Sequence, residues 1–177
     1  MGEDDPERDD VYDIEPVLEE EDLEDDEEDD HTEPNVHPTI DKSTWGPGPW
    51  QAEPDRVDFT HAGLTCLALR GHHGVWCGYV AVPPGHPLHG TVYWDIDVQV
   101  HGGLTYSQTG ADEVWWIGFD CGHDVRDRLP GMEACLRAAQ IPPLPRLPPG
   151  CEDVYRDLPY VRGQIRSLAD QLAHRTP

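Results

Sequence analysis

The stretch that decides the fold runs from residue 86 to residue 127 and reads HPLHGTVYWDIDVQVHGGLTYSQTGADEVWWIGFDCGHDVRD. Apolar and polar residues alternate from Thr91 to His101, which is typical of a β-strand with one buried face. Gly102-Gly103 follows at once, and glycine is favoured in a two-residue turn whose central residues both have positive φ. We therefore predict a three-stranded meander, with strands over residues 91–101, 104–108 and 114–121.

Upstream of this stretch, the sequence predicts a β-hairpin. Two apolar, β-rich runs cover residues 64–70 and 75–82, and the loop between them is Gly71-His72-His73-Gly74. A short glycine-bounded loop between two such runs is the usual signature of antiparallel strands.

Downstream, the sequence predicts two helices. Residues 131–140 suit a short helix, and a longer one should begin after Asp157, which can cap it with Pro159 in the first turn. The longer helix has one apolar stripe, formed by Val161, Ile165, Leu168 and Leu172. Between the helices, the proline-rich residues 142–149 must be extended. The predicted class is α+β, with a mostly antiparallel sheet (a hairpin plus a three-stranded meander), a short helix and a C-terminal amphipathic helix packed on the sheet.

Charge divides the chain into two parts. Of its 36 acidic and 12 basic residues, 20 acidic residues and one basic residue lie in residues 1–33. The rest of the chain, with 16 acidic and 11 basic residues, is only mildly acidic. Because a carboxylate-rich segment with few apolar residues cannot bury a core, we predict a disordered acidic tail over residues 1–43 and one α+β domain over residues 44–177.

Composition also narrows the setting of the protein. The sequence contains no run of about 20 apolar residues, the length a membrane helix needs, and it does not start with the basic and apolar regions of a secretory signal. Five cysteines without a Cys-x-x-Cys pair indicate free thiols in a reducing compartment. We therefore expect a cytoplasmic protein without a membrane partner.

Polar side chains gather where the first and third strands of the meander end. In a meander these strands run in the same direction, which would place His101 and Cys121 about 10 Å apart at one end of the sheet. In the alternative topology, a single hairpin with a long loop, roughly 27 Å would separate them. The glycine pair favours the meander. Since imidazole and thiolate groups suit zinc, we predict a divalent transition-metal site with candidate ligands His101, Cys121, His123 and His86.

The same region supplies candidate catalytic residues, namely Asp120, Asp124 and His123. The histidine could act as a general base, and either carboxylate could orient it or accept a proton. Simpler structural roles remain open. Cys121 could be a small buried residue on the face of Phe119, and His86 and His89 could fix their loop by hydrogen bonds.

Several motifs resemble a family of small proteins carried by bacteriophages and prophages. They are WQxEPDR (50–56), CGYVAVP (77–83), GHP (85–87), VHGGLTY (100–106), WWIGFDCGH (115–123), YR (155–156) and YV (160–161). The resemblance spans most of residues 50–172 and leaves out the acidic tail. It implies viral origin and a role in the host cytoplasm, with no particular reaction.

Two functional hypotheses follow. The first is a phage-encoded metal-assisted hydrolase, or a binder of a phosphorylated or nucleotide-like ligand, with zinc as the expected metal. The alternative is an interaction protein whose polyanionic tail mimics nucleic acid and inhibits a basic host or defence protein. Direct nucleic-acid binding is not expected. Whether the protein is an enzyme remains open from the sequence.

Overall fold

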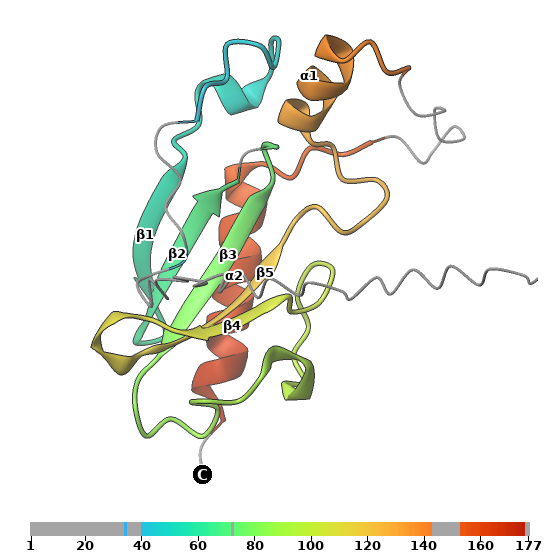
Figure 1. Cartoon of the computed structure of the whole chain (residues 1–177). Helices are drawn as coiled ribbons and strands as arrows, with labels where there is room; N and C mark the ends of the chain where they lie inside the picture. Colours follow the sequence, from blue (N-terminus) through green and yellow to red (C-terminus); the bar gives the residue numbers. More distant parts are fainter. Residues whose placement is uncertain (1–33, 35–39, 72, 143–152, 176–177) are drawn as a thin grey trace, which may run out of the picture.

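The computed structural model describes residues 34, 40–71, 73–142 and 153–175, and its centre is a five-stranded antiparallel sheet (Figure 1). The strand order is β1-β2-β3-β5-β4. The strands are β1 (Arg56–His61), β2 (Leu64–Arg70), β3 (Trp76–Val82), β4 (Tyr106–Thr109) and β5 (Trp115–Asp120). With one helix packed along the sheet, the α+β class predicted from the sequence is confirmed.

The predicted hairpin is β2 and β3. Leu69 stands opposite Cys77 in the ladder, and the Gly71 N–H donates to the Val75 carbonyl at 2.8 Å to close the loop. His72, in the middle of that loop, lies outside the described residues. The third predicted strand is β5, which pairs with β3 on one side and β4 on the other.

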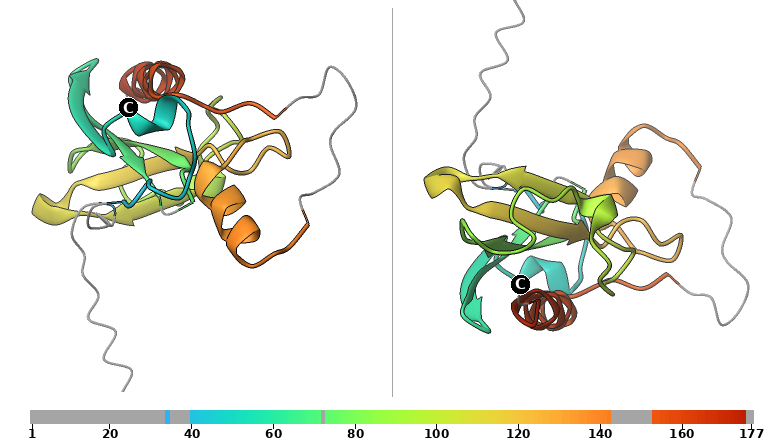
Figure 2. Two further views of the ribbon diagram at one scale, coloured as in Figure 1. Left: turned by 90° about the horizontal axis from the view of Figure 1, so that it is seen from above. Right: turned by 90° about the horizontal axis from the view of Figure 1, so that it is seen from below.

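The C-terminal helix α2 (Leu158–Ala173) covers one face of the sheet, as Figure 2 shows from above and below. Its predicted apolar stripe is fully buried against β2, β3 and β5. The Asp157 carboxylate accepts a hydrogen bond from the Tyr160 N–H at 2.9 Å, which confirms the predicted cap. The close approach of the helix explains one glycine, because a Cβ at Gly78 would lie 2.7 Å from Ile165. No helix in the described part of the chain is both long and apolar enough to cross a membrane.

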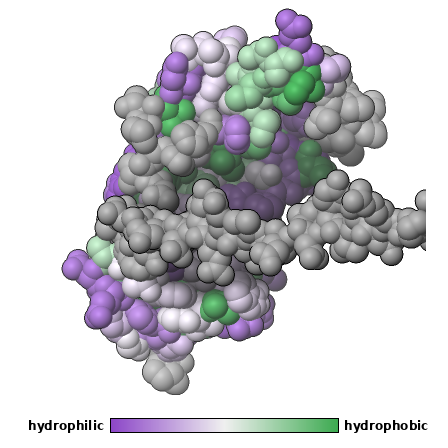
Figure 3. Space-filling view, viewed as in Figure 1, coloured by the Kyte–Doolittle hydropathy of each residue, from purple (hydrophilic) through white to green (hydrophobic). Residues whose placement is uncertain are grey.

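The helix α1 (Pro130–Ala138) matches the predicted short helix and packs against the segment that contains Trp45 and Trp50. Trp45, Trp50 and Ala134 form a small core there, with Ile40 against it. The Lys42 ammonium lies 2.7 Å from the Asp55 carboxylate. Residues 40–43, which the sequence analysis assigns to the tail, thus contact the body. Figure 3 shows apolar surface over α1, and Ile141 just beyond the helix is half exposed.

The predicted strand over residues 91–101 is wrong. The chain forms a short 3-10 helix, η2 (Tyr93–Asp95), and then runs extended beside α2 without joining the sheet. Glutamine side chains of the helix satisfy this backbone. The Gln171 amide oxygen accepts from the Gln99 N–H at 2.8 Å, and the Gln164 amide oxygen accepts from the His101 N–H at 2.9 Å. The alternation of apolar and polar residues correctly predicts that one side of this segment is buried, and Ile96 joins the core there. The alternation does not reveal whether the backbone bonds to a neighbouring strand or to side chains.

Candidate functional site

The glycine turn predicted from the sequence places His101. Gly102 and Gly103 have φ of 66° and 84°, and the Gly103 N–H donates to the Val100 carbonyl at 3.1 Å. Positive φ at both positions is the conformation that favours glycine. The turn carries the chain from the extended segment beside α2 to β4, and it leaves the His101 side chain between the helix and the loop after β5.

Both ring nitrogens of His101 have partners. Nε2 lies 2.8 Å from a carboxylate oxygen of Asp127, and Nδ1 lies 3.0 Å from the Tyr160 hydroxyl. An ionised carboxylate only accepts, so Nε2 carries the proton. In the neutral imidazole, Nδ1 is then the acceptor for the Tyr160 O–H.

Asp127 is the buried anchor of this group. Its side chain is 1% exposed, and besides His101 it accepts hydrogen bonds from Arg156 Nε at 2.9 Å and from the Asp124 N–H at 3.0 Å. The backbone explains how these residues meet. Residues 126–128 pair with Val154, which brings the segment before α2 against the loop after β5.

Tyr160 and Arg156 are where this cluster opens outward. The Arg156 guanidinium lies 4.9 Å from the centre of the Tyr160 ring, and its side chain is 17% exposed. Within the described residues, its two terminal nitrogens have no hydrogen-bond partner. Burial raises the pKa of the Tyr160 hydroxyl, although Arg156 acts in the opposite direction. The hydroxyl therefore keeps its proton at neutral pH and can donate it.

A second histidine–carboxylate pair stands on the neighbouring loop. His123 Nδ1 lies 2.7 Å from an Asp120 oxygen, and that carboxylate also accepts from the Gly122 N–H and the Thr105 hydroxyl, each at 3.0 Å. His123 is 60% exposed. Since Nδ1 donates to Asp120, the neutral ring presents its Nε2 lone pair outward. A Cβ at Gly102 would lie 3.6 Å from the His123 Cβ, so this loop borders the turn that carries His101.

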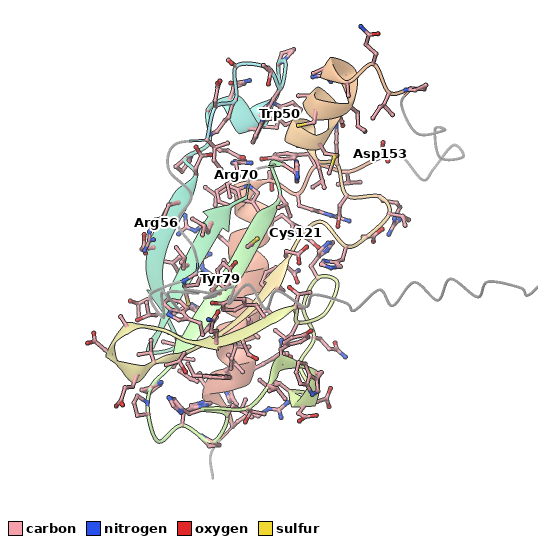
Figure 4. All side chains as sticks on the ribbon, viewed as in Figure 1. Trp50, Arg56, Arg70, Tyr79, Cys121 and Asp153 are labelled. Carbon is pink, nitrogen blue, oxygen red and sulfur yellow. The ribbon has the colours of Figure 1, made fainter. Side chains whose placement is uncertain are left out.

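Cys121 does not share this surface. Its side chain is 2% exposed and belongs to the core beneath α2, on the face of Phe119 (Figure 4). Burial raises the pKa of the Cys121 thiol, and the Asp127 charge raises it further. A protonated, buried thiol is a poor nucleophile and a poor ligand. The structural alternative stated from the sequence is therefore the one that this geometry supports.

The other predicted residues lie apart from the cluster or are engaged locally. His86 Nε2 lies 3.2 Å from the Leu172 carbonyl, twelve residues along α2 from Tyr160, which is roughly 18 Å at the helical rise. His89 Nε2 lies 2.7 Å from the Glu113 carbonyl. Asp124 pairs with Arg126, whose backbone and side-chain hydrogen bonds lower the pKa of that carboxyl.

Each of the four predicted metal ligands is in a different place, with His123 paired to Asp120 on an exposed loop. His101 is engaged in the Asp127 cluster, Cys121 is in the core and His86 is near the end of α2. Among the residues that the structure describes, no three histidine, cysteine or carboxylate side chains are grouped so as to hold a metal ion. Zinc binding stays a prediction, and His123 is its most accessible candidate ligand.

Sequence reasoning missed the roles of Tyr160 and Arg156. Tyr160 lies in the first turn of α2, 59 residues from its partner His101, and Arg156 precedes the helix, 29 residues from its partner Asp127. The only signal for them was their presence in the YR and YV motifs. Comparisons with known protein families, with curated proteins and with solved structures find no match.

Proposed function

We propose that the body of this protein is a small-ligand acid–base site for a phosphorylated or nucleotide-like molecule. The observation that carries the proposal is the chain of contacts from Asp127 through His101 to the Tyr160 hydroxyl. A buried carboxylate that orients an imidazole, which in turn faces a hydroxyl, is a recurrent arrangement for proton transfer.

Each group has a chemical role in this proposal. In the proton-donating form of the site, His101 carries protons on both ring nitrogens, with Nε2–H donating to Asp127 and Nδ1–H donating to the Tyr160 oxygen. Tyr160 gives its proton to the leaving oxygen, the Nδ1 proton of His101 passes to the tyrosinate, and His101 takes up a new proton from water. Arg156 attracts the anion with its unpaired terminal nitrogens. His123, oriented by Asp120, has the free lone pair that a base for an attacking water needs. A divalent metal bound beside His123 would assist by polarising a phosphoryl oxygen.

The experiment uses the full-length protein with ¹³C-labelled histidine. Inorganic phosphate is titrated first, followed by a panel of phosphomonoesters and nucleotides, with ³¹P NMR to detect turnover. We expect the His101 and His123 ring signals to shift while that of His174, at the end of α2, stays in place. Y160F should abolish turnover and keep the fold. No selective shift and no turnover with any member of the panel would contradict the proposal.

The metal component has its own test. Untagged protein is analysed for zinc, manganese and iron, and its thermal unfolding is compared before and after chelation. A stoichiometric metal that H123N loses would support metal assistance. No stoichiometric metal together with unchanged unfolding would count against it and leave the acid–base site to be judged by the titration.

A second candidate function is favoured by the charge of residues 1–33, with 20 acidic residues and one basic residue. We propose that this segment mimics nucleic acid and occupies the basic surface of a host or defence protein. The resemblance to phage proteins supports such a setting inside an infected bacterium.

The test compares the full-length protein with a variant of equal length in which the carboxylates of residues 19–30 are replaced by their amides. Because residues 40–43 contact the body, this variant is a better control than a truncation at residue 43. Partners bound at low salt should be lost from the variant and released from the wild type as salt increases. Identical partners for both proteins would contradict a role for the acidic segment.

A further inference from the structure

Two arginines of α2 lie over one aromatic ring of β1, away from the His101 cluster. The guanidinium carbons of Arg162 and Arg166 are 5.1 Å and 5.9 Å from the centre of the Phe59 ring. Residues four apart on a helix are neighbours, and two like charges in this relation repel each other. Figure 2 shows β1 beside α2. The protein thus holds two positive charges together on one apolar surface.

Neither charge is neutralised by the part of the chain that the structure describes. Arg162 Nε is buried and has no hydrogen-bond partner there, and neither guanidinium forms an ion pair there. Asp170, four residues after Arg166, lies 2.9 Å from His61 Nε2 instead. A buried N–H without a partner is unfavourable, so the arrangement favours a group that accepts from it.

Other arginines of the body show the contrast. Arg70, Arg126, Arg128 and Arg156 each lie within hydrogen-bond or ion-pair distance of a carboxylate. The pair on α2 is therefore different in kind from the arginines that stabilise the fold.

The helix also leaves room beside the pair. Gly163 is exposed in the interior of α2, where glycine is less favourable than alanine. A Cβ at this position would meet nothing within 4 Å. Because Gly163 and Arg166 are three residues apart, the missing side chain opens the approach to the guanidinium group.

We infer that Arg162, Arg166 and Phe59 form an oxyanion-binding site. The ligand class is a carboxylate or phosphate group, whose oxygens match the planar donors of a guanidinium. The aromatic ring beneath holds the two side chains in place and favours their charge. Two sources could supply the oxyanion: the carboxylates of residues 19–30 of the same chain, at high effective concentration, or a phosphorylated molecule. The inference does not depend on the acid–base site.

The experiment observes the arginine Nε–H signals of the full-length protein by NMR. Wild type and the variant with amidated residues 19–30 are each titrated with inorganic phosphate. If the chain's own carboxylates occupy the site, the Arg162 and Arg166 signals differ between the two proteins before phosphate is added. If the ligand comes from outside, these signals coincide at first and shift with phosphate in both proteins. Arg70 and Arg137 serve as internal controls.

Substitutions complete the test. Arg166 is exposed, so R166Q should leave the fold intact, and it should weaken phosphate binding about tenfold, as expected for the loss of a charge-assisted hydrogen bond. R166K keeps the charge without the planar donors, so its affinity for phosphate should lie between those of the wild type and R166Q. The inference is overturned if neither phosphate nor amidation moves the Arg162 and Arg166 signals more than that of Arg137. The histidine signals report separately on the acid–base site, so failure of one proposal is distinguishable from failure of the other.

Discussion

Two charged clusters are built from the same short segment that leads into α2, and they differ in how completely their groups are paired. Tyr155 reaches one cluster, centred on Arg70 at the end of β2, while Arg156 and Tyr160 reach the other, centred on His101. Figure 4 shows Arg70 toward the end of the sheet nearest α1. Two residues that follow each other in sequence thus serve clusters with different properties.

The Arg70 cluster is closed. The Arg70 side chain is 0% exposed and donates to Glu53 at 2.6 Å, to Asp55 at 2.8 Å and to the Tyr155 hydroxyl at 2.6 Å. Its guanidinium carbon also lies 4.1 Å from the centre of the Trp76 ring. The Tyr155 hydroxyl donates in turn to Glu53 at 2.5 Å. Each nitrogen of the Arg70 guanidinium and the Tyr155 hydroxyl has an internal acceptor, so this cluster stabilises the fold and leaves neither group for a ligand.

The His101 cluster is open on one side. Asp127 is as well paired as Glu53, but Tyr160 is only half buried, and among the described residues the terminal nitrogens of Arg156 lack partners. The difference shows what separates a structural charge cluster from a candidate site. Both need a buried carboxylate, but only the open cluster keeps a proton donor and a cation that a ligand could reach.

The largest expected effect is at the closed cluster. R70M should lower the free energy of unfolding by about 3–5 kcal/mol, because it leaves the partly buried Glu53 without its cation. Urea denaturation measures this loss. The matched control is R126M, which removes a half-exposed partner of Asp124 and should cost at most about 1 kcal/mol. Equal losses in the two variants would show that Arg70 is not the buried anchor described here.

The next largest effect is a difference in stability between variants of the two histidine–carboxylate pairs. D127N leaves Arg156 and His101 facing a group that accepts less well, and it should cost up to about 3 kcal/mol in urea denaturation. D120N should cost at most about 1 kcal/mol, because the exposed His123 ring can bond to water instead. A larger loss for D120N would reverse the assignment of the two pairs.

Acid sensitivity should also come from the closed cluster. Burial acts to raise the pKa of Glu53, but hydrogen bonds from the Leu158 N–H, Tyr155 and Arg70 outweigh it and hold the pKa below its ordinary value of 4.5. A lowered folded-state pKa means that this stabilisation is present above pH 4.5 and is lost as the pH falls through the folded pKa.

The measurement is the urea midpoint between pH 6 and pH 3. Wild type should lose stability below about pH 4.5 more steeply than E53Q, by at most about 1.4 kcal/mol per pH unit for one proton. E53Q is less stable than wild type at pH 6, so the two curves should converge in acid. Parallel curves would indicate that Glu53 does not carry this part of the acid response.

How far the sequence predicts this structure depends on whether the determining contacts are local. The cap at Asp157, the apolar stripe of α2 and the glycine loop between β2 and β3 are local patterns, and all were predicted correctly. The strand predicted over residues 91–101 was wrong, because the backbone at Gln99 and His101 bonds to glutamines more than 60 residues away.

The same distinction applies to the candidate site. His123 and Asp120 are three residues apart and were predicted together, and they form a pair. Tyr160 and Arg156 join the site only through the packing of α2, which no spacing in the sequence shows. Cys121 was predicted as a ligand, although its alternation with Phe119 already placed it on the buried face. There the periodic signal was a better guide than the chemistry of the side chain.

The finest comparison uses one hydroxyl in each cluster. Y155F removes a group that bridges Arg70 and Glu53, and burial, which raises the pKa of Tyr155 to about 12, keeps it a donor at all ordinary pH values. Its loss removes one hydrogen bond from Arg70 and one from Glu53 and should cost about 1–3 kcal/mol. Y160F removes a hydroxyl that water can replace at His101 and should cost about 1 kcal/mol or less.

In phosphate titrations the order of the two effects should reverse. Y160F should change the response of the His101 NMR signal to phosphate, and Y155F should leave that response unchanged. If both variants lost stability equally and neither altered the His101 signal, the His101 cluster would be as closed as the Arg70 cluster, and the case for chemistry at Tyr160 would fail.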